Sequence, residues 1–298
     1  MKLEIRNMSK SFKGYPALRD VSVSFETGIY ALLGPNGSGK STFMNILTDN
    51  IIPDSGSVYL AIDGKRLSLG DDPGSFLNHI GYMPQEARLY PDFTVSEFCE
   101  YVAVLKNLPK AEANRNISDI MRSLELDDIK GKKIRTLSGG MKQRLSLAQA
   151  IIGSPDILLL DEPTAGLDPK QRISIRNFIS RTALSKTVIY ATHVVSDIEF
   201  IARDIIMLKN GSVIENAPLG ELTKKIEGKV WILPCAETEV QKLQKSYRVT
   251  NIARDEDSGN VLLRVLSDEK PDVSAKTVAP TLEDYYLYVF DDIPVSTE

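Results

Sequence analysis

Apolar runs and helical patterns alternate along most of the chain. Residues 29–33, 79–83, 156–160 and 187–191 are largely apolar, as expected for strands that are buried on both faces of a sheet. Apolar residues at helical spacing lie between these runs and predict helices at 43–48, 94–105, about 111–126, 142–152 and about 170–184. Strands that alternate with helices indicate an α/β fold with a parallel sheet.

The segments before and after the first buried run and its helix show a different pattern. Residues 3–8 and, more clearly, 21–26 alternate between apolar and polar side chains, which predicts half-buried strands. We assign 3–8 to an edge strand and 57–62 to a further strand. The polar, glycine-rich stretch 69–75 is expected to be a loop.

Two other regions differ from the α/β pattern. The helices between about 86 and 155 indicate an inserted helical subdomain, and Thr94 to Glu97 has the form of a capping box at a helix start. A hairpin at 204–215 and a helix at 219–226 precede a change at 228. We therefore expect one domain at 1–227 and a small α+β appendage at 228–298. Its amphipathic segment 281–290 covers a sheet face or, less commonly for such a stripe, meets a partner.

Composition narrows the classes of protein that fit. The chain has 298 residues, of which 42% are hydrophobic and 26% charged, which is ordinary for a soluble globular protein. The net charge of −4 gives no general attraction for nucleic acid, so no nucleic-acid partner is expected. Cys99 and Cys235 have no Cys or His neighbours at metal-ligand spacing and are expected to be plain thiols.

Neither a signal peptide nor a membrane span is expected. The N-terminal residues lack an apolar core segment, and no run reaches about 18 consecutive apolar residues. A membrane role would therefore require a partner.

A glycine-rich stretch between the first buried run and its helix carries the clearest chemistry. Its context of strand, loop and helix is that of a phosphate loop, in which backbone N–H groups, a lysine and a hydroxyl converge on a nucleoside triphosphate and Mg²⁺. The alternative is a glycine turn that matches the pattern by chance. The candidate nucleotide-binding residues are Gly34, Asn36, Gly37, Ser38, Gly39, Lys40, Ser41 and Thr42.

Polar residues follow two other buried runs. Asp161 and Glu162 end one run and predict an Mg²⁺ ligand and a group that orients or deprotonates the attacking water, although such a pair can also simply begin a turn. His193 ends another run and is expected to contact a γ-phosphate, the alternative being a packed histidine. Phe12, with Tyr15 second, is a candidate to stack on adenine from a loop, or else it packs on its own hairpin.

The ordered motifs resemble the ATP-binding-cassette nucleotide-binding domain over roughly residues 1–225. Residues 34–42 resemble its Walker A loop and 157–162 its Walker B strand. Residues 137–141 resemble its signature. The same residues precede a predicted helix and have the form of a second anion-binding helix start. Gln85 is similar to its Q-loop residue, residues 165–168 to its D-loop, and His193 to its switch histidine.

The resemblance implies a mechanism with two chains. Two such domains would close head to tail, so that ATP on Lys40 and Ser41 of one chain is also held by the signature of the other. The bound groups would be ATP and Mg²⁺, and a homodimer and a heterodimer both remain open. Glu162, His193 and Gln85 would be catalytic; Ser41, Gln85 and Asp161 would hold the metal; and Phe12, Ser138, Gly139, Gly140 and Asp168 would join the phosphate loop in binding nucleotide.

The resemblance also implies transport. Integral membrane permease subunits would be separate chains, and this chain would lie at the cytoplasmic face of a bacterial cell membrane. Residues 279–288 are similar to the ending of bacterial cassettes that serve type-two permeases, which favours export. The alternatives are a soluble ABC ATPase that acts on ribosomes or DNA, and the energy subunit of an importer.

Overall fold

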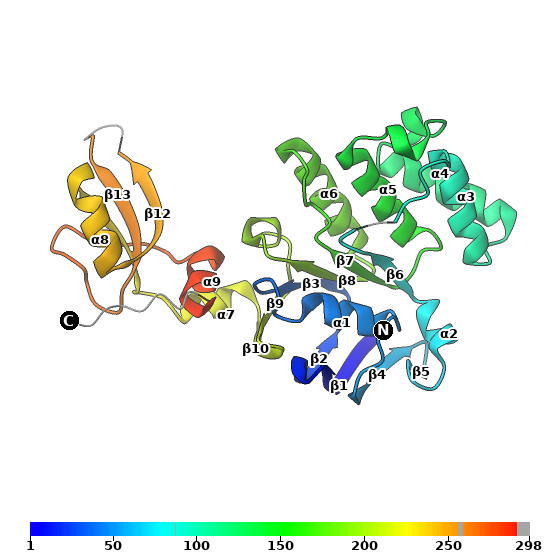
Figure 1. Ribbon diagram of the computed structural model, residues 1–298, viewed down its shortest axis with the longest axis horizontal. Coiled ribbons are helices and arrows are strands. Elements are labelled where there is room, and N and C mark those ends of the chain that lie inside the picture. Colours follow the sequence, from blue (N-terminus) through cyan, green and yellow to red (C-terminus); the bar gives the residue numbers. More distant parts are fainter. Residues whose placement is uncertain (87, 256–258, 291–298) are drawn as a thin grey trace. The chain divides into compact units, whose positions relative to one another are not determined.

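The computed structural model describes residues 1–86, 88–255 and 259–290. The chain divides into two compact units, Met1–Asn216 and Ala217–Glu298 (Figure 1). This division precedes the expected boundary at 227, because helix α7 (Leu219–Lys224) packs on helix α9 (Leu282–Phe290) in the second unit. Residue 87 of the expected helical subdomain and residues 256–258 and 291–298 of the expected appendage lie outside the described residues.

A six-stranded sheet organises the first unit. Strands β9, β3, β8, β7 and β6 run parallel to their neighbours, with β10 next to β9. Nearly every residue of β3, β7 and β8 is buried, which confirms the interpretation of the apolar runs and the α/β fold class. In sheet order the strands are β10 (Ser212–Ala217), β9 (Asp204–Lys209), β3 (Gly28–Leu33), β8 (Thr187–Thr192), β7 (Ile157–Asp161) and β6 (Ile80–Met83).

An antiparallel sheet shares a core with this sheet and helix α1 (Lys40–Leu47). Phe43 and Leu47 of α1 pack in one buried cluster with side chains of both sheets. The order of the antiparallel sheet is β2 (Tyr15–Phe25), β1 (Lys2–Phe12), β4 (Ser55–Ile62) and β5 (Lys65–Ser68).

Two details of this sheet differ from expectation. Strand β1 is an interior strand and not an edge strand, since it pairs with both β2 and β4. Its alternation reflects one buried face and carries no information about its two edges. The expected loop at 69–75 contains the start of a short helix, α2 (Pro73–Leu77), which Asp72 caps by accepting a hydrogen bond from Ser75 N.

The helical insertion contains α3 (Val95–Leu105), α4 (Lys110–Ser123) and α5 (Gly139–Ile151), with single 3₁₀ turns at Asp127–Ile129 and Ile134–Thr136. The predicted capping box is confirmed: Thr94 N donates to Glu97 Oε2 at 2.6 Å, and Glu97 N donates to Thr94 Oγ1 at 3.2 Å. Helix α6 (Pro169–Thr182) follows β7, and a 3₁₀ turn at Val195–Asp197 follows β8.

The second unit is an antiparallel sheet with helices. The sheet order is β12 (Arg248–Arg254), β13 (Val261–Leu266), β11 (Val230–Cys235) and β14 (Lys276–Thr277). A 3₁₀ turn at Glu237–Glu239 leads into α8 (Val240–Ser246), whose Leu243 packs against the apolar face of the sheet. Within the described ranges no helix is long and apolar enough to cross a bilayer.

Candidate nucleotide-binding site

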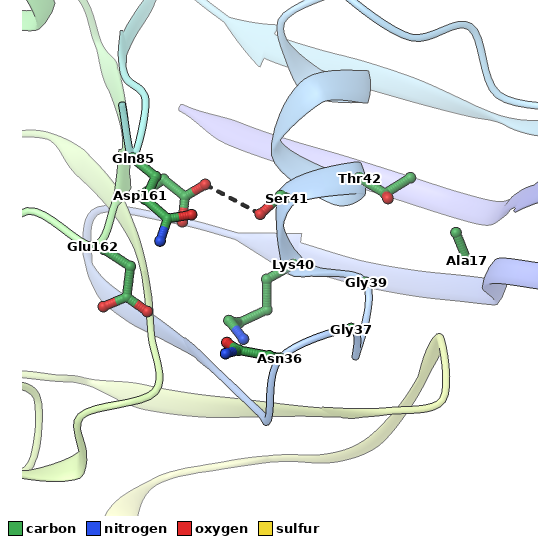
Figure 2. Close-up of a pocket in the computed structure, with 10 residues that line it drawn as sticks. All are labelled: Ala17, Asn36, Gly37, Gly39, Lys40, Ser41, Thr42, Gln85, Asp161 and Glu162. Atoms are coloured by element: carbon green, nitrogen blue, oxygen red, sulfur yellow. Dashed lines mark hydrogen bonds between the residues drawn. The ribbon is translucent and has the colours of Figure 1, made fainter. Parts of the chain in front are cut away.

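A pocket of about 160 Å³ lies where β3 and β7 end and α1 begins (Figure 2). It brings the phosphate loop together with residues that follow β6 and β7. The lining residues are Ala17, Asn36, Gly37, Gly39, Lys40, Ser41, Thr42, Gln85, Asp161 and Glu162. Nine of these ten were predicted from the sequence, and Ala17 was not.

Backbone geometry explains the glycines of the loop. Gly37 and Gly39 have φ angles of 78° and 112°, in a region that L side chains rarely adopt. A Cβ atom on Gly39 would also lie 2.5 Å from the carbonyl oxygen of Ala17. Gly34 and Ser38 are buried, and among the described residues Ser38 Oγ has no hydrogen-bond partner. A cradle of this shape, with an unused hydroxyl, fits a bound phosphate.

Lys40 is the cation of the pocket. Its side chain is buried, and Nζ donates to the carbonyl oxygens of Gly34 at 2.6 Å and Pro35 at 3.1 Å. Burial lowers the pKa of Lys40, and the nearby carboxylates of Glu162 and Asp161 offset only part of that effect. A desolvated ammonium group with two replaceable carbonyl contacts is suited to bind the β- and γ-phosphates.

Ser41 and Asp161 face each other across the pocket. Ser41 Oγ donates to Asp161 Oδ2 at 3.3 Å (Figure 2). Burial raises the pKa of Asp161, as does the charge of Glu162, while Ser41 and Lys40 act in the opposite direction. Gln85 follows β6 and lines the same pocket.

The oxygens of Ser41, Asp161 and Gln85 fit a Mg²⁺ site whose ligand set is completed by the phosphates of a nucleotide. In the part of the chain that the structure describes, no group of three or more His, Cys, Asp or Glu residues could hold a metal alone. Mg²⁺ is commonly bound by one or two carboxylates together with waters and substrate phosphates. The donor set of Ser41, Asp161 and Gln85 therefore suits a metal that arrives with a nucleotide.

Glu162 occupies a constrained position directly after β7. Its φ angle is 50°, an uncommon conformation for a non-glycine residue, and its N–H donates to Ala191 O at 2.9 Å. The carboxylate accepts hydrogen bonds from Thr192 Oγ1 at 2.9 Å and from His193 N at 3.0 Å. The ring nitrogen Nδ1 of His193 lies 2.5 Å from Glu162 Oε1. The structure thus joins the predicted glutamate and histidine, each of which follows a different strand.

The remaining predicted residues do not line this pocket. Ser138 caps α5, accepting a hydrogen bond from Met141 N at 3.3 Å; Gly139 and Gly140 begin that helix. Asp168 caps α6 through Gln171 N at 2.9 Å. Ser138, Gly139 and Asp168 are exposed, which leaves them accessible to another molecule.

Phe12 lies at the end of β1 and not in a loop. It pairs with Tyr15 across the hairpin turn and remains 44% exposed, with Lys10 Nζ 5.6 Å from the ring centroid. Ala17, on the same hairpin, lines the pocket. The exposed face of Phe12 is compatible with stacking on a base.

Thr192 is a site residue that sequence reasoning missed. It is fully buried, and it contacts both the Glu162 carboxylate and Val194 N. Its place next to His193 at the end of a buried strand was a signal, since parallel strands end on the same sheet edge.

Residues 18–165 match the protein-family model described as ABC transporter. The uncharacterized ABC transporter ATP-binding protein YxlF of Bacillus subtilis is 33% identical over 236 residues, which cover 79% of this chain and 77% of that protein. The probable sulfate/thiosulfate import ATP-binding protein CysA of Chlorella vulgaris is 33% identical, covering 75% of this chain and 94% of that protein. The linearmycin resistance ATP-binding protein LnrL of Bacillus subtilis is 30% identical, and the match covers 76% of this chain and 72% of that protein.

Solved structures show the same similarity. The structure of an ATP-binding subunit of an ABC transporter matches with a TM-score of 0.68 and 26% identity, covering 76% of this chain and 93% of that one. The ATP-binding cassette MJ0796, in a dimeric post-hydrolysis state bound to ADP and Pi, matches with a TM-score of 0.65 and 29% identity. The match covers 72% of this chain and 98% of that one.

Proposed function

The chain belongs to the ABC transporter family as an ATP-binding subunit with ATPase activity, and we propose that it drives export through separate membrane permease subunits. The observation that carries the site assignment is the convergence of Lys40, Ser41 and Asp161 with the Glu162–His193 pair at one sheet edge. This edge combines a phosphate cradle, a metal-binding oxygen pair and a candidate base.

Hydrolysis follows from these positions. Lys40 and the loop N–H groups bind the β- and γ-phosphates, and Glu162 accepts a proton from the water whose oxygen attacks the γ-phosphorus. The bond between the γ-phosphorus and the bridging oxygen breaks, and ADP carries away the electron pair. His193, held against Glu162 at 2.5 Å, donates toward the γ-phosphate oxygens once a nucleotide is present.

The bound metal would be Mg²⁺. Ser41 Oγ and Asp161 would hold it, directly or through water, with Gln85 at the same edge of the pocket. When bound, it neutralises charge on the phosphates.

The exposed start of α5 supports a site shared between two chains. Ser138 and Gly139 present a helix N-terminus, which favours anions, away from the chain's own pocket. Head-to-tail closure would place this N-terminus on the ATP held by the other chain. MJ0796 is dimeric in the structure cited above. Because this chain carries both halves of such a site, a homodimer would be competent, and a different partner subunit would also serve.

The second unit supports the assignment to export. The Thr281-to-Asp284 segment that resembles exporter cassettes forms a capping arrangement: Thr281 N donates to Asp284 Oδ2 at 2.8 Å, and Asp284 N donates to Thr281 Oγ1 at 3.2 Å. The matched protein LnrL is named for linearmycin resistance, whereas the matched CysA is named for sulfate/thiosulfate import. We place the subunit at the cytoplasmic face of a bacterial membrane, with no nucleic acid as partner.

Affinity capture tests this proposal. The Glu162→Gln chain, which should keep ATP bound, is used as bait with ATP and Mg²⁺ on detergent-solubilised membranes of the source organism, and captured proteins are identified by mass spectrometry. Lys40→Ala bait is the control that should not close on ATP. A multi-span protein without a solute-binding protein supports export, and one with a solute-binding protein indicates import. Ribosomal or DNA-bound proteins alone would contradict the transport proposal.

A further inference from the structure

A buried hydroxyl–carboxylate pair lies next to the candidate base. Thr164, two residues after Glu162, is 1% exposed, and Asp197, four residues after His193, is 3% exposed. Thr164 Oγ1 donates to Asp197 Oδ2 at 2.5 Å, and it lies 3.0 Å from the hydroxyl of Tyr190. Nothing in the hydrolysis scheme above uses these three side chains.

The hydrogen-bond directions follow from the proton inventory. A threonine hydroxyl has one proton, and Thr164 gives it to Asp197. Tyr190 must therefore donate its own proton to Thr164 Oγ1. The result is a run of two hydrogen bonds from Tyr190 through Thr164 to Asp197, and all three side chains are buried.

Besides the backbone bond from Glu162 N to Ala191 O, two sets of side-chain hydrogen bonds tie the same segments together, and this is the second set. The first joins the Glu162 carboxylate to Thr192 and His193. The second joins Thr164, on the loop after β7, to Asp197, in the 3₁₀ turn after β8. Both ties connect the loop after β7 with β8 and the segment that follows it.

The Thr164–Asp197 contact can do what the first set of hydrogen bonds cannot, because the first set uses the Glu162 carboxylate, which is the group that reacts. Glu162 has a backbone conformation that costs free energy and persists only where neighbouring contacts enforce it. If its carboxylate turns toward water, contacts with Thr192 and His193 change. The Thr164–Asp197 contact involves no reacting atom and can hold the loop in place throughout.

We propose that Asp197, acting through Thr164, is a positioning residue that holds the loop carrying Glu162 against β8 during ATP hydrolysis. This inference rests on the proposed role of Glu162. The rival interpretation is that the pair stabilises the fold only, as a satisfied buried carboxylate does elsewhere.

Thr164→Val is the direct test, because valine matches threonine in shape and lacks the hydroxyl. Small displacements of a reacting group can cost about 100-fold in rate. We expect kcat for ATP hydrolysis to fall by about 10- to 100-fold, while KM for ATP stays within about twofold because Lys40 is untouched. Thr164→Ser, which keeps the hydroxyl, should restore most of kcat. Thr182→Val removes a hydroxyl that, among the described residues, bonds to Phe178 O on α6, and it should leave kcat unchanged.

Two further variants separate positioning from stability. Asp197→Asn with Thr164→Val removes the buried charge that Thr164→Val leaves without its hydroxyl partner; thermal stability should recover relative to Thr164→Val alone, but kcat should not. If Thr164→Val fails to fold, Asp197→Asn alone still removes the charge that accepts the Thr164 hydroxyl and should lower kcat. Normal kcat in the folded variant, or kcat that recovers together with stability, would overturn the proposal.

The Glu162→Gln background distinguishes this failure from failure of the proposed function. If Thr164 acts through Glu162, adding Thr164→Val to Glu162→Gln should not slow the residual hydrolysis further. If the kcat losses of the two single variants instead multiply in the double variant, the Thr164–Asp197 pair acts independently of Glu162. Wild-type hydrolysis by Glu162→Gln alone would instead refute the role of Glu162 itself.

Discussion

Replacing Lys40 by alanine should weaken ATP binding more than any substitution at an exposed lysine. The change removes a buried ammonium group that donates to two loop carbonyls, Gly34 O and Pro35 O. It also removes the positive charge that lies near the carboxylates of Glu162 and Asp161. The pocket therefore becomes more negative where the phosphates bind.

The size of the effect follows from the contacts that are lost. Hydrogen bonds to charged groups are worth about 1.5–3 kcal/mol. That range converts to a Kd for ATP that rises by roughly 10- to 150-fold. Because the carbonyl contacts of Lys40 must be given up when phosphate binds, we expect the lower half of this range.

Isothermal titration calorimetry with a non-hydrolysable ATP analogue measures the effect. Lys110→Ala is the matched control, since Lys110 is an exposed residue at the start of α4. A Kd for Lys40→Ala within twofold of the Lys110→Ala value, in a folded protein, would refute the phosphate-loop assignment.

Three further substitutions test other parts of the account. Thr94→Ala removes half of a capping box and should lower the stability of the chain by about 1 kcal/mol, seen as a lower thermal midpoint. Gly39→Ala places a Cβ 2.5 Å from Ala17 O and should abolish measurable ATP binding; normal binding would argue against the cradle geometry. Arg264→Leu leaves buried Asp284 without its cation, 2.6 Å away, and should cost about 3–5 kcal/mol in urea unfolding.

The Arg264–Asp284 pair also predicts a pH dependence. Burial alone would raise the pKa of Asp284, but hydrogen bonds from Arg264 and Thr281 outweigh it, so the folded pKa lies below 3.8. A lowered carboxyl pKa contributes stability that is complete above the unfolded pKa and is lost as pH falls through the folded one. The stability difference between wild type and Arg264→Leu should therefore shrink below about pH 4. A constant difference there would contradict the ionic account.

The sequence predicted what periodicity and motifs encode locally. The apolar runs located β3, β7 and β8, and the glycine pattern located the pocket between strand and helix. Pairing partners are not local, which is why β1 was assigned to an edge although β4 covers its second side. The position of α7 likewise depends on its packing against α9, which no nearby residue signals.

The site was predicted by residue type but not by contact. Glu162 and His193 were expected as separate groups, and the structure joins them with Thr192 in one hydrogen-bonded cluster. Thr164 and Asp197 carry no motif of their own as a pair, since 33 residues separate them along the chain. The two side chains come into contact only because β7 and β8 pair in parallel and end at the same edge of the sheet.

The most direct test is phosphate release from ATP and Mg²⁺ by the purified chain, compared with its Glu162→Gln variant. General-base catalysis contributes about 100- to 10,000-fold. We expect the variant to lose at least about 100-fold in kcat while its Kd for ATP stays near that of wild type. Equal rates of phosphate release would contradict the assignment of Glu162 as the base.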